Sequence, residues 1–138
     1  MPTVELTKEN FEQTILDNDT VFVDFWAEWC GPCRSFAPTY EAAANKHEDI
    51  VFAKVNTELE QELAGYFQIR SIPTLMVFRE NVILFSQPGA LPAPMLHDLI
   101  TQIKDVDMED VHRQIAEHAA EGHEDHAHDG HDHEDAAV

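Results

Sequence analysis

The sequence predicts an α/β fold in which a central mixed β-sheet is flanked by helices on both faces. Through the first 104 residues, short β-branched and aromatic runs alternate with segments whose apolar residues recur at helical spacing. This alternation is typical of parallel strands joined by crossover helices. The last two apolar runs are separated by only a few residues, which predicts a β-hairpin and adds an antiparallel edge to the sheet.

The first half of the chain is expected to hold two strands and two helices. The alternating stretch TVEL predicts a short strand over 3–6, and apolar residues at helical spacing predict a helix over 8–17 with Thr7 as its N-cap. The run TVFVDFWA (20–27) is rich in β-branched and aromatic residues, so it predicts a fully buried strand. Helical spacing then resumes over 33–47.

The second half is expected to complete the sheet and close it with a helix. A buried-type strand (50–55) and a helix (58–67) follow, and this order implies a parallel pair of strands joined by a right-handed crossover. Strands at 74–78 and 82–86, joined through RENV, form the predicted hairpin. A closing helix over 91–103 is expected to face the sheet with Met95, Leu99, Ile100 and Ile103.

The C-terminal quarter differs in composition from the rest of the chain. The net charge is −19, and residues from 105 onward carry more than half of it. Residues 105–120 keep apolar residues at helical spacing and predict an amphipathic helical extension of the domain at 1–104. Residues 121–138 consist mainly of acidic residues, histidine, glycine and alanine. They bury too little apolar surface to offset the entropy of ordering, so we expect a disordered tail.

The charge and the hydropathy argue against several classes of partner. Binding to phosphate needs Lys and Arg, so the acidic balance argues against nucleic acid and against anionic membrane surfaces. No apolar run approaches the length of a membrane span, and the first residues lack the basic and apolar regions of a secretory signal. We therefore expect a cytoplasmic protein that is a monomer.

The two cysteines of the chain, Cys30 and Cys33, stand in the stretch EWCGPCRSF. A structural zinc site normally takes four ligands, and the histidines ahead of the C-terminal quarter, His47 and His97, are far apart in the sequence and not spaced as a pair. A disulfide between residues three apart closes so short a loop that it constrains the unfolded chain little. Redox chemistry by a reactive dithiol is the interpretation that remains.

The position of the pair favours that chemistry. The motif lies where a predicted strand turns into a helix, so Cys30 is expected beside the helix N-terminus, which stabilises a thiolate. Cys33, one turn inside, suits a resolving thiol that cleaves a mixed disulfide. Asp24 and Lys54 stand in apolar strands. A buried Asp24 would have a raised pKa and could move a proton to or from Cys33, whereas Lys54 has the simpler interpretation of a side chain that reaches solvent.

The stretches VDFWAEWCGPCRSFAP, KVN and IRSIPTLMVF occur in the order and spacing of one family, and residues 3–104 resemble the thioredoxin family throughout. The resemblance implies the thioredoxin fold and the reduction of disulfides in protein substrates, with electrons returned by a thioredoxin reductase. It implies no cofactor beyond the redox-active disulfide itself. The Gly-Pro dipeptide between the cysteines is similar to that of the reducing members of the family.

The resemblance also assigns site residues, position by position. Cys30 is similar to the nucleophile of the family and Cys33 to its resolving thiol, while Asp24 is similar to its buried proton-transfer carboxylate. Lys54 is the usual neighbour of that carboxylate. Pro73 is similar to a cis-proline that packs against the disulfide and borders the substrate groove. The apolar rim that would meet a substrate chain consists of Trp29, Gly31, Pro32, Ile72, Gly89 and Ala90.

The tail supports two interpretations. Its histidines, interleaved with acidic residues, could gather around Zn²⁺, Ni²⁺ or Cu²⁺ without a fixed geometry. The simpler interpretation, which the composition favours, is a solvated acidic tail that keeps the protein soluble and tunes its choice of partner. The candidate metal ligands are His123, His126, His128, His131 and His133.

Three functions remain open. The first is the reduction of protein disulfides through Cys30 and Cys33. The second is a binding or chaperone-like module, in which the rim around Trp29 and Pro73 holds client proteins and the redox state only gates docking. The third is a metal-responsive protein that uses the histidines of its tail. Disulfide reduction explains the most residues, because the resemblance accounts for the thiols without a metal.

Overall fold

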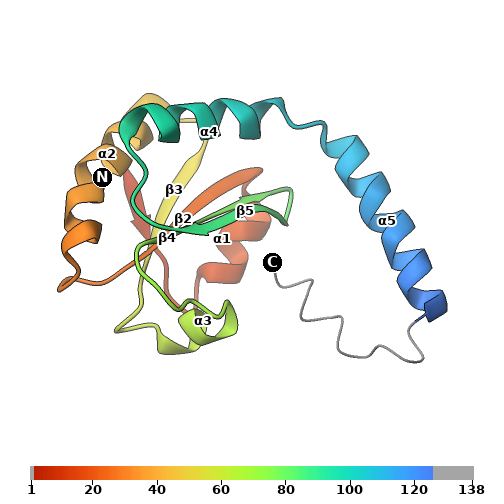
Figure 1. Ribbon diagram of the computed structural model, residues 1–138, viewed down its shortest axis with the longest axis horizontal. Coiled ribbons are helices and arrows are strands. Elements are labelled where there is room, and N and C mark those ends of the chain that lie inside the picture. The colour runs from red at the N-terminus through yellow and green to blue at the C-terminus, as the bar shows by residue number, and fades with distance from the viewer. Residues whose placement is uncertain (1, 126–138) are drawn as a thin grey trace. The chain divides into compact units, whose positions relative to one another are not determined.

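Five strands form the sheet on which the first part of the chain is organised. The computed structural model describes residues 2–125 and orders the strands β1–β3–β2–β4–β5 (Figure 1). Strands β1, β3 and β2 are parallel, β4 is antiparallel to β2, and β5 is antiparallel to β4. The sheet is therefore mixed, as the sequence predicts. Its strands are β1 (Thr3–Glu5), β2 (Thr20–Trp26), β3 (Val51–Asn56), β4 (Thr74–Arg79) and β5 (Val82–Pro88).

Helices cover both faces of this sheet, which confirms the predicted α/β class. Helices α2 and α4 lie on one face, and α1 and α3 lie on the other (Figure 1). Only residues 27–30 separate the end of β2 from the start of the long helix α2. The helices of this part are α1 (Phe11–Asp17), α2 (Gly31–Lys46), α3 (Gln61–Tyr66) and α4 (Ala93–Asp105).

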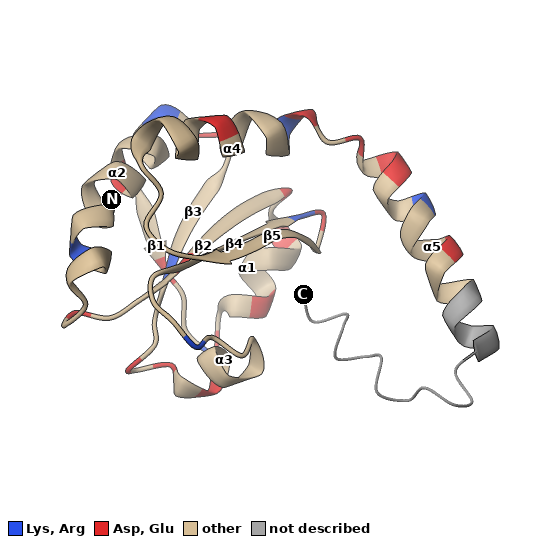
Figure 2. Ribbon diagram, viewed as in Figure 1, with Lys and Arg blue, Asp and Glu red and all other residues tan. Residues whose placement is uncertain are grey.

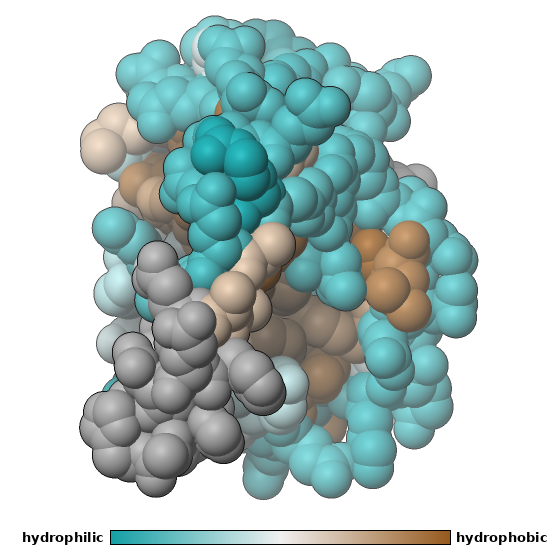
Figure 3. All heavy atoms as spheres, turned by 90° about the vertical axis from the view of Figure 1, so that its right-hand side faces the viewer, coloured by the Kyte–Doolittle hydropathy of each residue, from teal (hydrophilic) through white to brown (hydrophobic). Residues whose placement is uncertain are grey.

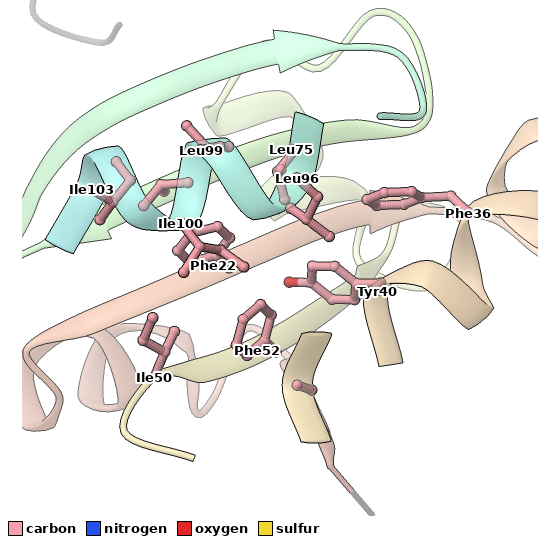
Figure 4. Packing of buried hydrophobic residues seen from close by; sticks show 12 residues of the cluster. Phe22, Phe36, Tyr40, Ile50, Phe52, Leu75, Leu96, Leu99, Ile100 and Ile103 are labelled. Atoms are coloured by element: carbon pink, nitrogen blue, oxygen red, sulfur yellow. The ribbon is translucent and has the colours of Figure 1, made fainter. Parts of the chain in front are cut away.

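The central strands are buried on both faces, and their alternation feeds two apolar cores. Phe22 and Phe52 meet the residues of α2 and α4 in the first core, where their ring centroids are 5.0 Å apart (Figure 4). Val23 and Phe25 point the other way, into the second core beneath α1 and α3. Because a strand buried on both faces needs no polar alternation, the continuous apolar run at 20–27 is explained.

Two local expectations from the sequence are wrong. Helix α1 begins at Phe11 instead of residue 8, because the side chain of Asn10 accepts a hydrogen bond from the backbone N–H of Thr7 at 2.7 Å and holds residues 8–10 in a turn. Thr7 is therefore not the N-cap. In α4, Met95 is 55% exposed instead of facing the sheet. Leu96 is buried in its place, since it completes the i, i+3, i+4, i+7 spacing of the buried residues in α4.

The residues after Ile103 form a separate unit. It contains α5 (Met108–Asp125), where the sequence predicts a helical extension over 105–120. Acidic residues occupy its first turn, where the helix dipole favours negative charge. Arg113 pairs with Asp110 and, at 3.6 Å, with Glu117. The sequence predicts disorder over residues 121–138, whereas α5 continues to Asp125. The remaining residues of that stretch, 126–138, lie outside the described residues.

Most charged residues lie outside the sheet, on helices and loops. Figure 2 shows most Asp and Glu residues on helices and loops, while the strands are mostly uncharged. The face drawn in Figure 3 is largely hydrophilic, with smaller apolar areas between the polar side chains. Among the described helices, none combines the length and the apolar character that crossing a bilayer requires.

The corrected face of α4 gives a prediction with a built-in control. We expect Leu96→Ala to lower the free energy of unfolding by about 2–5 kcal/mol, because it leaves a cavity in the core. We expect Met95→Ala, one residue earlier in the same helix, to change it by less than about 0.5 kcal/mol, because that side chain is solvent-exposed. Urea denaturation of both variants measures the difference. Equal losses would show that the face of α4 is misassigned.

Candidate functional site

The cysteine motif lies at the junction between β2 and α2. The strand ends at Trp26, and Cys30 is the N-cap residue of α2, with its Sγ accepting a hydrogen bond from the backbone N–H of Cys33 at 3.2 Å. Pro32 occupies the first turn of the helix, where a missing N–H costs no helical hydrogen bond. The sulfur of Cys30 therefore lies at the positive end of a 16-residue helix.

The two cysteines are joined in a disulfide. Cys30 is 4% exposed and Cys33 is 3% exposed, and they form a small apolar cluster with Ala27. The side chains of Trp26 and Ile72 pack against this cluster. The structure thus describes the oxidised form of the pair, held in an apolar surrounding that excludes water from most of the disulfide.

The loop before β4 brings Pro73 to the disulfide. The Ile72–Pro73 peptide bond is cis, as the resemblance implies for this proline. The carbonyl oxygen of Ile72 lies 3.7 Å from Cys30 Sγ, and the backbone N–H of Gly89 donates to the carbonyl of Pro73 at 2.8 Å. Gly89 has φ of 109°, a conformation that favours glycine. Three segments far apart in the sequence therefore meet at this point.

The six predicted rim residues share one property, since none of them is buried. Trp29 is the largest and is 65% exposed, with its Nε1–H donating to Glu58 Oε2 at 3.1 Å. Ile72 contacts the disulfide cluster directly, and Gly89 is bonded to the loop that carries Pro73. The remaining three, Gly31, Pro32 and Ala90, follow Cys30 or Gly89 in the chain.

Asp24 is buried in the central strand, at 1% exposure. Its Oδ1 has no hydrogen-bond partner among residues 2–120, whose side chains the structure describes. Its neighbours in register are Lys54 on β3 and the apolar Leu75 on β4. Burial raises the pKa of Asp24 to about 7, against the attraction of Lys54, which lowers it, and with a smaller upward contribution from Glu5. This carboxyl is therefore able to take up or release a proton near neutral pH.

Lys54 does not simply extend into solvent. Its side chain is half-buried, and its Nζ lies 4.4 Å from the ring centroid of Trp26. The indole Nε1–H of Trp26 in turn donates to Glu5 Oε2 at 3.4 Å. Glu5 and Trp26 are not predicted as site residues from the sequence. The one hint in the sequence is that Glu5 stands within a predicted strand. Their meeting depends on the pairing of β1 with β3, which the sequence did not reveal.

The structure also brings together two histidines that are distant in the sequence. The ring centroids of His47, after α2, and His97, in α4, are 6.5 Å apart beside a groove of about 110 Å³. Across the described part of the chain, however, no group of three or more His, Cys, Asp or Glu side chains is placed to hold a metal ion. The tail histidines proposed as metal ligands, from His123 onward, lie outside the described side chains.

Electrons enter and leave such a site in pairs, through the cleavage and formation of one S–S bond. This chemistry defines a thiol–disulfide exchange protein built on a mixed sheet. The family model described as thioredoxin matches residues 2–105. The chain therefore belongs to the thioredoxin family.

Similar proteins agree with this assignment. The chain is 57% identical over 119 residues to the "Putative thioredoxin 2" of Streptomyces coelicolor, an alignment that covers 86% of this chain and 89% of that protein. It is 42% identical over 94 residues to a thioredoxin of Chlorobaculum thiosulfatiphilum, covering 67% and 87% of the two chains. Because the first alignment covers 119 residues, it necessarily extends beyond the matched family domain into the segment that forms α5.

Solved structures give the same fold. A thioredoxin from Plasmodium falciparum superposes with a TM-score of 0.68 at 34% identity, covering 72% of this chain and 98% of that chain. A mutant thioredoxin from Halobacterium salinarum superposes with a TM-score of 0.71 at 29% identity, covering 76% and 93%.

Proposed function

We propose that this protein reduces disulfide bonds in other proteins, by dithiol–disulfide exchange through Cys30 and Cys33. The observation that carries the proposal is the position of the pair, with Cys30 Sγ at the N-terminus of α2 and the cis-proline loop packed against it. Membership of the thioredoxin family supports protein disulfides as substrates and a thioredoxin reductase as the source of electrons.

In the first step, the thiolate of Cys30 attacks one sulfur of a substrate disulfide. The positive end of α2 and the N–H of Cys33, which points at Cys30 Sγ, favour this thiolate over the thiol. A bond forms between Cys30 Sγ and the attacked sulfur while the substrate S–S bond breaks. The other substrate sulfur leaves as a thiolate, and a mixed disulfide remains.

In the second step, Cys33 resolves the mixed disulfide. Asp24 serves as the group that accepts the proton of the Cys33 thiol, because its pKa of about 7 lets it change protonation state at the working pH. The Cys33 sulfur then attacks Cys30 Sγ, and the second substrate sulfur leaves as a thiolate. The substrate has gained two electrons, and the protein is left in the disulfide form that the structure describes.

The exposed rim is assigned to substrate contact. Trp29, in the loop before Cys30, is exposed, and the carbonyl of Ile72 lies against Cys30 Sγ. A substrate chain laid across Cys30 would meet apolar side chains and backbone there instead of charge. Lys54 is assigned to the proton-transfer group and not to the rim, because it is paired in register with Asp24.

We further propose that the protein acts as a monomer in the cytoplasm. The two cysteines and the cis-proline loop meet within a single chain, so the proposed reaction requires no second copy. A reducing compartment keeps the dithiol available as a reductant, and the cytoplasm is such a compartment.

For the tail, we propose adaptable binding of Zn²⁺, Ni²⁺ or Cu²⁺ by the five histidines from His123 to His133. Isothermal titration with zinc should give binding heat for the full chain. The heat should disappear when all five histidines are replaced by alanine, because imidazole nitrogens are the expected ligands. Equal heat from the full chain and the variant would show that zinc binds outside these histidines. Negligible heat from both would contradict the proposal and favour a solvated acidic tail that binds no metal.

The roles of the two cysteines are tested by single variants. With insulin as the disulfide substrate, Cys33→Ser should accumulate a covalent mixed disulfide through Cys30, because the resolving thiol is missing. Cys30→Ser should form no such adduct, because the attacking thiol is missing. Both variants should reduce insulin at least about 10³-fold more slowly, because the two cysteines act together in one catalytic cycle. Mass spectrometry and insulin turbidity measure the two results.

A Cys30→Ser, Cys33→Ser double variant separates reduction from redox-gated binding. Complete loss of insulin reduction supports the proposed function. If the double variant still bound client proteins, and still complemented a cell that lacks the natural chain, the result would instead support a binding or chaperone-like module. Adduct formation by Cys30→Ser and not by Cys33→Ser would reverse the assigned roles.

A further inference from the structure

Three charged residues occupy one row across the sheet. The parallel register of β1 and β3 pairs Glu5 with Lys54, and the parallel register of β3 and β2 pairs Lys54 with Asp24. Residues aligned on neighbouring parallel strands point to the same face of the sheet. Phe52, two residues before Lys54, packs in the core beneath α2, so the row lies on the α2 face. One ammonium group therefore stands between two carboxyl groups.

Trp26 connects this row to the disulfide. Its Nε1–H donates to Glu5 Oε2 at 3.4 Å, and Lys54 Nζ lies 4.4 Å from its ring centroid, within the range of a cation–π interaction. The same indole packs against the cluster of Cys30 and Cys33. A continuous series of contacts thus leads from the Glu5 carboxylate to the reactive sulfurs.

We propose that Glu5 is a positioning residue for disulfide exchange, which fixes the Trp26 indole behind the disulfide and shares Lys54 with Asp24. This inference rests on the proposed function. Because Lys54 is attracted by two carboxylates, it stabilises the ionised form of Asp24 less than a lysine with a single partner would. Asp24 then binds a proton more tightly, which strengthens it as the acceptor of the Cys33 proton and moves the ionisation of its own carboxyl to a higher pH.

The electrostatic surroundings agree with this arrangement. Burial is the largest cause of the raised pKa of Asp24, Lys54 opposes it, and the negative charge of Glu5 adds to it. From α2, the side chain of Tyr40 feels the negative charge of Asp24, and its hydroxyl donates to the carbonyl of Ala53 at 2.8 Å. Burial raises the pKa of Tyr40 well above its ordinary value, so the phenol stays neutral while Asp24 titrates.

Groups from three parts of the chain act on the carboxyl of Glu5. Partial burial raises the pKa of its carboxyl, while the hydrogen bond from Trp26 and the charge of Lys54 lower it. The charge of Glu60, ahead of α3, raises it slightly. Glu60 Oε1 accepts a hydrogen bond from the backbone N–H of Lys8, three residues after β1, at 2.9 Å. Removing the charge of Glu5 therefore alters the balance around Lys54 without removing any residue of the disulfide cluster.

The test is Glu5→Gln, which removes the charge and keeps an oxygen that accepts from Trp26. In the oxidised chain, the carboxyl carbon of Asp24 is followed by NMR as the pH is raised. We expect the midpoint of the Asp24 titration to fall by about 0.5 pH unit relative to the natural chain, because the negative charge of Glu5 is lost. Two strand spacings place the two carboxyl groups about 10 Å apart, so the effect of one charge on the other is modest. The pH of half-maximal insulin reduction should fall with it.

Glu12→Gln is the matched control, because Glu12 is an exposed glutamate of α1 outside this row. In this variant, the midpoint of the Asp24 titration should equal that of the natural chain. An unchanged or higher midpoint in Glu5→Gln overturns the inference, and so does a lower midpoint with no change in the pH profile of insulin reduction. The NMR titration uses no substrate, so it gives its answer even if the natural chain fails to reduce insulin.

Discussion

The burial of Asp24 in the central strand is the constraint around which this structure is arranged. A carboxyl group with an unpartnered oxygen in an apolar sheet opposes its own ionisation, and burial raises its pKa to about 7. A protein gains no stability from such a group at neutral pH. The two apolar cores on either side of β2 offset that cost, because they keep the strand and its carboxyl in place.

Around this carboxyl, the order of the strands brings distant segments together. Because β2 lies between β3 and β4, Lys54 and the loop with Pro73 both come from its immediate neighbours in the sheet. The same strand continues into α2 and delivers the two cysteines. A single strand thus carries the carboxyl that exchanges a proton and the indole of Trp26, and it ends shortly before Cys30. Proton transfer and electron transfer are therefore coupled over a short length of chain.

Much of this arrangement is predictable from the sequence, because it depends on local patterns. Buried strands, the hairpin and the dithiol at a helix start all follow from the order of residue types. What the sequence does not reveal depends on long-range pairing. The meeting of Glu5 with Lys54 needs the register of β1 on β3, and that of His47 with His97 needs the packing of α2 beside α4. The error at Met95 is different, since a shift of one residue moves a side chain by more than a quarter of a turn.

The account depends most directly on the ionisation of Asp24. Its pKa is raised in the folded chain above the value of about 3.9 expected when unfolded, so the folded state binds the extra proton and stability falls as the pH rises between these values. Urea unfolding of the oxidised chain and of Asp24→Asn, from pH 4 to pH 8, measures this. We predict that the variant gains up to about 4 kcal/mol over the natural chain across that window. A difference that is the same at every pH would contradict the account.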